Sequence, residues 1–396
     1  MMQISPETQL FIREHSSDDV RTLALQAKKY PDINMPTAIT QIAGRKVAAE
    51  KIPSWWEIEK IWYPKHLSLE QCSSEITARY KARLLQGDSL TDLTGGFGID
   101  CSFLATGFKS ATYVERQEEL CEIAAHNFPV LNLNHINIKN EDGVTYLQAM
   151  SPVDCLFLDP ARRNEHGGKT VAISDCEPNV AELEELLLQK ANRVMIKLSP
   201  MLDLSLALKE LKQTQEVHIL SVNNECKELL ILLGQTSPTE ISIHCVNLST
   251  KGTQEEQHFV FTREQEQCSE CTYTDSLETY LYEPNASLLK AGAFRSIAAA
   301  YPVRKLHPNS HLYTSDTFIE NFPGRIFRIV NQCSFNKKEV KENLADLKKA
   351  NVTVRNFPAT VAELRKRIHL AEGGDTYLFA STLNNGQKVL IRCEKV

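Results

Sequence analysis

Between residues 89 and 248 the sequence alternates short apolar segments with amphipathic ones, and this alternation constrains the fold more than any other feature. The predicted strands are residues 89–94, 110–115, 136–140, 154–159, 193–199, 217–222, 228–234 and 241–248. Predicted helices at residues 101–108, 118–128 and 180–191 fall between the earlier strands. Strands separated by helices run parallel under two helical layers, and right-handed crossovers wind the sheet in both directions. The sequence therefore predicts an α/β fold with a doubly wound, mostly parallel sheet.

The chain divides into three predicted parts. Residues 1–86 form a helical domain, because apolar residues recur there every three or four positions. We expect its three tryptophans, Trp55, Trp56 and Trp62, to pack helices together, although clustered aromatics can also stack bases. Residues 87–250 contain the sheet, and residues 251–396 a polar stretch followed by a small α/β module. A helix is predicted there from the charged segment "NKKEVKENLADLKKA", and a terminal hairpin turns at Asn-Asn-Gly.

The segment "DLTGGFGID", residues 92–100, follows a predicted strand and opens a predicted helix. Three glycines in four positions are costly to order, because glycine loses more backbone freedom than any other residue. In parallel sheets such a loop lies where ligands bind, so Gly96 and Gly98 are expected to let a ligand approach the backbone. Acidic groups at both ends, Asp92 and Asp100, suit a cationic, amino-acid-bearing ligand better than a pyrophosphate. A dinucleotide fingerprint would also need a third glycine where Cys101 stands.

Polar residues end the next strands as well. Glu115 ends the second strand, 17 residues beyond Gly98, where a carboxylate can accept both hydroxyls of a ribose. After the third strand, Asp142 either accepts from an adenine amino group or forms a turn. The fourth strand runs into Asp159, and the fifth ends at Lys197, a substrate contact or an ordinary strand-end lysine. Each residue alone has a structural explanation, but the clustering at successive strand ends points to one ligand site.

These elements resemble the class I S-adenosylmethionine-dependent methyltransferases. The segment Asp-x-Thr-x-Gly-x-Gly-x-Asp is similar to their first motif, in the form found in ribosomal-RNA guanine-N2 methyltransferases. The resemblance implies a Rossmann-like fold with bound S-adenosyl-L-methionine and the following cofactor-binding residues: Asp92, Thr94, Gly95, Gly96, Phe97, Gly98, Asp100, Glu115, Asp142 and Asp159. The end of the chain, with "YEPNASLLKAGAFRSIAAA" and "LRKRIHLAEGGDTYLF", resembles a THUMP-like domain.

The fourth motif departs from the family pattern. Methyltransferases acting on exocyclic amines typically have Asn/Asp-Pro-Pro and then an aromatic residue that stacks the base. This sequence has Asp159-Pro160-Ala161-Arg162. The resemblance implies that Asp159 and Pro160 are catalytic, with Asp159 orienting an amine, while the Arg162 guanidinium can stack a base in place of the ring. Arg162 and Arg163 can equally form structural ion pairs.

Charge is distributed unevenly along the chain, whose formal net charge is −6. Residues 286–396 contain 18 basic and 9 acidic residues, a formal charge of +9, so the remainder carries −15. A basic module on an acidic body is typical of proteins that bind nucleic acid, here rRNA or tRNA. The alternative is a set of solvated helix faces with no partner.

Hydropathy and cysteine content argue against a membrane, secreted, disulfide-bonded or zinc-binding protein. The sequence contains no apolar run of membrane-spanning length and no signal-peptide pattern at its start, so we expect a cytoplasmic protein that does not enter membranes. Eleven scattered cysteines indicate reduced thiols. The lone pair Cys268 and Cys271 supplies half of a zinc site, so no metal is expected.

The sequence thus predicts an S-adenosylmethionine-dependent enzyme that methylates a base in structured RNA. Two alternatives stay open: an RNA-binding protein that keeps the cofactor fold without catalysis, and a methyltransferase acting on a protein or small molecule. A nicotinamide oxidoreductase is disfavoured by the missing glycine. The oligomeric state is not indicated by the sequence.

Overall fold

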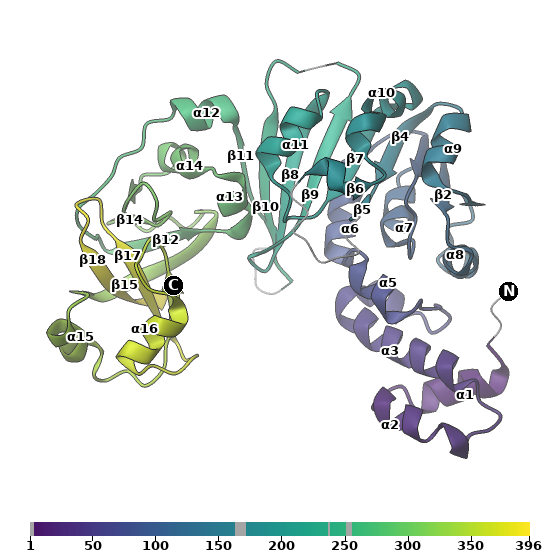
Figure 1. Cartoon of the computed structure of the whole chain (residues 1–396), viewed down its shortest axis with the longest axis horizontal. Helices are drawn as coiled ribbons and strands as arrows, with labels where there is room; N and C mark the ends of the chain where they lie inside the picture. Colours follow the sequence, from purple (N-terminus) through teal and green to yellow (C-terminus); the bar gives the residue numbers. More distant parts are fainter. Residues whose placement is uncertain (1–3, 163–171, 237, 251–255) are drawn as a thin grey trace. The chain divides into compact units, whose positions relative to one another are not determined.

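A computed structural model describes residues 4–162, 172–236, 238–250 and 256–396 (Figure 1). The chain forms two compact units. The first comprises residues 1–216 and 229–239, and the second comprises residues 217–228 and 240–396. The mixed α/β class, the large mostly parallel sheet and the smaller C-terminal α/β domain are as predicted, while the three-part division at residues 86 and 250 stays a prediction.

The N-terminal part of the first unit is helical, as predicted. Its helices are α1 (Pro6–Glu14), α2 (Val20–Leu25), η1 (Ala27–Lys29), α3 (Met35–Lys51), α4 (Pro53–Trp56), α5 (His66–Gln71) and α6 (Glu75–Ala82). Trp55 is buried in the core of this part, whereas Trp56 is 41% exposed. Trp62 stacks on His126, with ring centroids 3.7 Å apart. Two of the three tryptophans therefore pack against protein.

In the first unit the strands follow the order β9-β7-β4-β1-β2-β3. They are β1 (Ser89–Asp92), β2 (Ser110–Glu115), β3 (Ile136–Asn140), β4 (Val153–Leu158), β7 (Ala191–Leu198) and the part of β9 (Glu225–Gly234) from Leu229 onward; most of β8 (Thr214–Val222) belongs to the second unit. Strands β3, β2, β1, β4 and β7 run parallel, and β9 runs antiparallel to β7. The parallel topology brings the carboxyl ends of these five strands to one edge.

Helices connect the parallel strands and cover the sheet. They are α7 (Ile99–Ala105), α8 (Glu118–Val130), α9 (Gly143–Ala149), α10 (Val180–Lys190) and α11 (Leu204–Glu210), with a short ribbon of β5 (Ala161–Arg162) and β6 (Cys176–Glu177) beside η2 (Ile173–Asp175). Most residues of the central strands β4 and β7 are buried, as expected for a sheet covered on both faces. Strand order turns away from β1 in both directions, so the ends of β1 and β4 mark the position where such folds bind ligands.

The second unit contains the antiparallel pair β10 (Ser242–Leu248) and β11 (Glu256–Thr262) and a seven-stranded sheet of order β13-β14-β12-β15-β18-β17-β16. Its strands are β12 (Tyr280–Pro284), β13 (Arg304–Lys305), β14 (Tyr313–Ser315), β15 (Gly324–Ser334), β16 (Asn351–Val354), β17 (Thr376–Thr382) and β18 (Lys388–Lys395), and its helices are α12 (Arg263–Cys268), α13 (Ala286–Ala291), α14 (Phe294–Ala300), α15 (Lys337–Leu344) and α16 (Val361–Ile368). The predicted terminal hairpin is β17–β18.

One predicted helix of the second unit is shorter than the sequence indicated. The helix predicted from "NKKEVKENLADLKKA" ends at Leu344, so Lys348 and Lys349 lie outside it. The reason is a pair of backbone hydrogen bonds to a distant segment, Ala350 N to Ala371 O and Ala371 N to Lys348 O, each 3.0 Å long. This tertiary pairing outweighs the helical preference of the charged residues.

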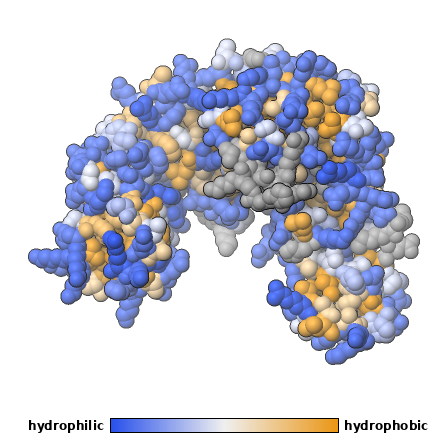
Figure 2. All heavy atoms as spheres, in the orientation of Figure 1, coloured by the Kyte–Doolittle hydropathy of each residue, from blue (hydrophilic) through white to orange (hydrophobic). Residues whose placement is uncertain are grey.

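In the part of the chain that is described, no helix combines the length and the apolar character needed to cross a membrane. The face drawn in Figure 2 is mostly hydrophilic, with apolar residues in separate patches.

Candidate functional site

The glycine loop joins β1 to α7 at the carboxyl edge of the sheet. Gly95 has no room for a side chain, because a Cβ there would lie 2.3 Å from the ring of Tyr113. The Tyr113 hydroxyl in turn donates to Gly96 O at 2.5 Å. Part of the glycine requirement therefore comes from packing within the protein.

The other two glycines adopt left-handed backbone conformations, with φ of +54° at Gly96 and +85° at Gly98. A Cβ on Gly98 would lie 3.1 Å from the Phe128 ring, whereas one on Gly96 would meet only Thr94 O at 3.8 Å. Gly96 is therefore the glycine of this loop that borders open space, where a ligand can approach the backbone.

Glu115 lies beside this loop, as its predicted role requires. One carboxylate oxygen accepts from Gly96 N at 2.9 Å, and the other accepts from Gln117 N at 2.8 Å. The residue is only 9% exposed. The end of β2 and the glycine loop thus form one rigid unit, with the carboxylate held at its edge.

Asp92 is buried at the end of β1 and is 1% exposed. Its carboxylate accepts from Thr94 N at 2.9 Å, but no ion pair to it occurs among the described residues. Burial raises the pKa of Asp92 to about 8, and the hydrogen bond from Thr94 only partly offsets this effect. A buried carboxyl without a cation is poised to take a positively charged partner.

Asp142 follows β3 and caps α9. One of its oxygens accepts from Val144 N and Thr145 N, both at 3.0 Å. Asp142 is therefore the N-cap of α9, which is a structural role for this side chain. Its contact with adenine stays a prediction.

Of the residues in and after the fourth motif, the structure describes Asp159 and Pro160 in full and Arg162 only in its backbone. Asp159 donates its backbone N–H to Thr94 Oγ1 at 2.6 Å, and its side chain is 38% exposed. Pro160 is buried. Arg162 pairs with Cys176 across the β5–β6 ribbon, but its side chain is not described, and Arg163 lies outside the described residues.

Phe97 turns away from the open side of the loop. It is 4% exposed and packs into the N-terminal helical part, with its ring 5.2 Å from Trp55 and 6.2 Å from Tyr63 between centroids. Its side chain joins the loop to the helices, so any contact of Phe97 with a cofactor would have to use the backbone.

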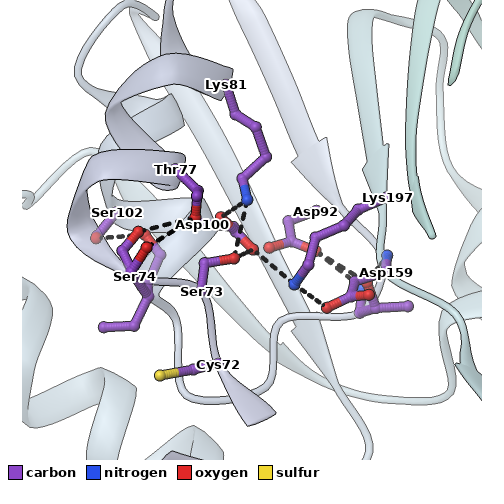
Figure 3. Close-up of polar contacts among 12 residues, drawn as sticks. Cys72, Ser73, Ser74, Thr77, Lys81, Asp92, Asp100, Ser102, Asp159 and Lys197 are labelled. Carbon is purple, nitrogen blue, oxygen red and sulfur yellow. Dashed lines mark hydrogen bonds and ion pairs between the residues drawn. The ribbon is translucent and has the colours of Figure 1, made fainter. Parts of the chain in front are cut away.

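Asp100 is the centre of a buried charge network (Figure 3). It forms ion pairs with Lys81 at 3.0 Å and Lys197 at 3.4 Å, and accepts from Ser73 Oγ at 2.7 Å. Burial opposes ionisation of this carboxyl, but the two ammonium groups outweigh it and hold the pKa of Asp100 at about 2. Lys197 also forms an ion pair with Asp159.

The predictions from sequence did not include Ser73 and Lys81. Lys81 is fully buried on α6, and its ammonium donates to Ser73 Oγ at 2.9 Å. The helical spacing could have indicated that Lys81 is buried. It lies three residues after Ala78 and four after Thr77, both on the buried face of α6. A lysine on the inward face of a helix indicates a buried anion, which here is Asp100.

Comparison with solved structures gives a relative that spans the whole chain. A proposed methyltransferase from Porphyromonas gingivalis W83 is 34% identical, with 100% of both chains covered and a TM-score of 0.88. The chain belongs to the class I methyltransferases with a C-terminal THUMP-like domain.

Family comparison supports the same assignment for the end of this methyltransferase. Residues 280–323 match a ferredoxin-like domain, and residues 324–395 match a THUMP domain-like family. Comparison with curated proteins gave no match.

Two other solved structures resemble only part of this chain. A modification subunit of a proposed type I restriction enzyme from Vibrio vulnificus YJ016 is 12% identical over 51% of this chain and 56% of that chain, with a TM-score of 0.35. A Streptococcus mutans protein in complex with SAH is 14% identical over 40% of this chain and 96% of that chain, with a TM-score of 0.30. Both likenesses are too weak to support an inference about this chain.

Proposed function

We propose that this methyltransferase uses S-adenosyl-L-methionine to methylate a base in structured RNA. The observation that carries the proposal is the convergence of Asp92, Glu115 and Asp159 on one edge of a class I sheet, around the glycine loop. Each of these carboxyl groups follows or ends a parallel strand, and each has a hydrogen bond that links its residue to the loop.

The carboxyl groups at this edge of the sheet suit the charged and hydroxyl groups of S-adenosyl-L-methionine. The cofactor carries a sulfonium cation, an amino acid and a ribose, and Asp92 is a carboxyl whose pKa is raised to about 8 by burial and by the neighbouring carboxylates. Glu115 accepts a hydrogen bond from Gly96 N at the loop, which supports its proposed role as the acceptor for the ribose hydroxyls. Gly96 borders open space on its Cβ side, so a ligand can reach its backbone. Asp142 and the backbone of residues 94–98 complete the proposed cofactor site.

The residues of the protein must then align the atom that accepts the methyl group. The cofactor supplies a methyl group on a strongly activated leaving group, so catalysis depends mainly on orientation in a dry site. Asp159 can accept a hydrogen bond from an exocyclic amine and fix its direction. Pro160 restricts the backbone of the loop that carries Asp159. Arg162 is the proposed stacking residue for the base, in the position where related enzymes have an aromatic ring.

RNA is proposed as the substrate because of the C-terminal domain. That region carries a formal charge of +9 between residues 286 and 396 and includes the THUMP-like match. Exposed lysines lie at positions 337, 338, 341, 348 and 349, where they can contact phosphates. The protein would then bind rRNA or tRNA through this domain while the first unit carries out methyl transfer.

The test uses methyl-labelled S-adenosyl-L-methionine with total RNA from a strain in which the gene has been deleted. Label should enter one nucleoside, identified by mass spectrometry after digestion, and RNA from the parent strain should accept much less. Cofactor binding measured by calorimetry without any transfer to RNA would favour the non-catalytic alternative. Transfer to protein or small molecules in the same extract would favour the other.

A further inference from the structure

Lys197 occupies an unusual position for a charged residue. It lies near the end of β7 within an apolar strand, between Ile196 and Leu198, which are 0% and 3% exposed, and is itself 8% exposed. An ammonium group in such surroundings is costly unless it is paired. Lys197 pairs with two carboxylates from different elements: Asp100 in the first turn of α7 and Asp159 directly after β4.

The Asp159 carboxylate depends on this contact. The backbone of Asp159 is held by Thr94 Oγ1, but among the described residues no side chain other than Lys197 bonds to its carboxylate. The bond uses one oxygen, Oδ2, and leaves the other as a possible acceptor. The loop also lacks the second proline and the aromatic residue that would restrain it in the Pro-Pro-aromatic form, because Ala161 and Arg162 stand there.

Lys197 is itself restrained from the opposite side. Asp100 Oδ2, which lies 3.4 Å from the Lys197 ammonium, also accepts from Ser73 at 2.7 Å. Lys81, fully buried, pairs with the other oxygen of Asp100 at 3.0 Å. The chain Lys81–Asp100–Lys197–Asp159 therefore runs from α6 to the proposed catalytic carboxylate without interruption (Figure 3).

We infer that Lys197 is a positioning residue that holds the Asp159 carboxylate turned toward the methyl acceptor, which rests on the proposed role of Asp159 in methyl transfer. In this arrangement the ammonium takes one carboxylate oxygen and the acceptor amine takes the other. The ion pair thereby supplies the restraint that the Pro-Ala-Arg sequence lacks. Lys81 and Ser73 act on the same carboxylate indirectly, by fixing Asp100.

The test compares Lys197→Met, Lys197→Arg and Arg193→Met. Arg193 is a matched control because it lies on the same strand and forms an ion pair with Glu216 at 2.8 Å. Initial rates of methyl transfer to total RNA from the deletion strain are measured between about pH 6 and pH 9 at saturating cofactor. Dissociation constants for S-adenosyl-L-methionine are measured in parallel by calorimetry.

Lys197→Met should lower kcat about tenfold or more near pH 7 and change the cofactor dissociation constant by less than about threefold. Burial raises the pKa of Asp159 and the Lys197 ammonium opposes this rise, so removing the cation should raise the pKa further and the lost rate should recover as the pH rises. Lys197→Arg should restore the original pH profile, and Arg193→Met should not alter it. A loss of kcat in Lys197→Met that is independent of pH and matched by Arg193→Met would overturn the inference, as would an unchanged rate.

A second measurement does not depend on activity. In crystal structures of the native protein and of Lys197→Met, the Asp159 carboxylate should keep its orientation in the first and turn away in the second. An unchanged orientation overturns the positioning role, whatever the rates show. If the native protein transfers no label to RNA, the proposed function fails, and the crystallographic comparison still decides whether Lys197 orients Asp159.

Discussion

Asp92 and Asp100 flank the same glycine loop, yet the pKa of the Asp92 carboxyl is raised and that of the Asp100 carboxyl is lowered. Asp100 is paired with two buried ammonium groups and its pKa is about 2, whereas Asp92 is buried without a cation and its pKa is about 8. The first carboxylate is therefore satisfied within the protein. The second is free to respond to a charged ligand.

Cofactor affinity should consequently depend on pH. Below about pH 8 the Asp92 carboxyl is protonated in the free protein and must release a proton before it can face a cation. We expect affinity for S-adenosyl-L-methionine to rise with pH between about 5.5 and 7.5, by up to about tenfold per unit. Calorimetry in two buffers of different ionisation enthalpy should show release of up to one proton. Asp92→Asn should bind without this proton release, and a native protein with flat affinity over the range would contradict the assignment.

Glu115→Ala should weaken cofactor binding by about 1.5–3 kcal/mol, or roughly ten- to a hundredfold, because the ribose loses a charged acceptor. The substitution also removes the acceptor for Gly96 N. Glu115→Gln is the matched control, since its amide oxygen can still accept from Gly96 while the charge is lost. Calorimetry should place its affinity between those of the native protein and Glu115→Ala. Unchanged affinity in the alanine variant would remove Glu115 from the cofactor site.

The two adjacent glycines should respond differently to alanine. Gly95→Ala places a methyl group 2.3 Å from the Tyr113 ring and should destabilise the fold by about 1–3 kcal/mol. Gly96→Ala meets no such neighbour and should lose only about 1–2 kcal/mol from its positive φ, with a larger loss of cofactor affinity. Urea denaturation and calorimetry on both variants separate the effects. Equal cofactor affinity in Gly96→Ala and the native protein would show that no ligand approaches there.

Lys81→Met should destabilise the protein by about 3–5 kcal/mol at neutral pH, because it leaves Asp100 buried with only one cation. The double variant with Asp100→Asn should recover much of this loss, since no buried charge is left unpaired. The pKa of Asp100 lies below its usual 3.8, so the stabilisation is present above about pH 4 and is lost as the pH falls toward 2. Denaturation of the two single variants and the double variant forms the test. Additive losses would show that the two residues do not interact.

Replacing Lys337, Lys338, Lys348 and Lys349 together by glutamate should weaken RNA binding with little loss of stability. All four side chains are exposed, although only the first two lie on α15. For every phosphate that the variant no longer binds, the slope of log affinity against log salt should become shallower by about 0.7, from a native slope near −3 for a handful of bound phosphates. Filter binding over a range of salt concentrations measures both quantities. A folded variant with native affinity and slope would place the RNA-binding surface elsewhere or remove it.

Most of the strands could be predicted because each depends on the residues within its own short segment. Residues 110–115 and 136–140 are strands with the predicted limits, since short apolar runs between turns leave few alternatives. Residues 345–349 were predicted to be helical from their charged pattern. The backbone of Lys348 and Ala350 instead forms hydrogen bonds with Ala371. Ala371 lies 21 residues beyond Ala350, so the sequence of the segment itself does not indicate this pairing.

The site was predictable to the extent that topology fixes it. Parallel strands end at one edge, so Asp92, Glu115 and Asp159 could be grouped from their positions alone. The pairing of Lys81 with Asp100, and of Lys197 with both aspartates, could not be predicted. Those contacts join residues up to 97 positions apart, and they depend on packing that no spacing rule encodes.

The burial of Phe97 against Trp55 and Tyr63 has a consequence for modularity. A cofactor-binding fold is often treated as a cassette that can be excised or grafted. Here the aromatic residue in the middle of the glycine loop belongs to the core of the preceding helices, and Lys81, one of the two cations that pair with Asp100, comes from α6. A fragment starting at residue 87 would keep the sequence of the loop and lose the surroundings that shape it. A transplanted or truncated version of this site would therefore need both the N-terminal helices and the sheet.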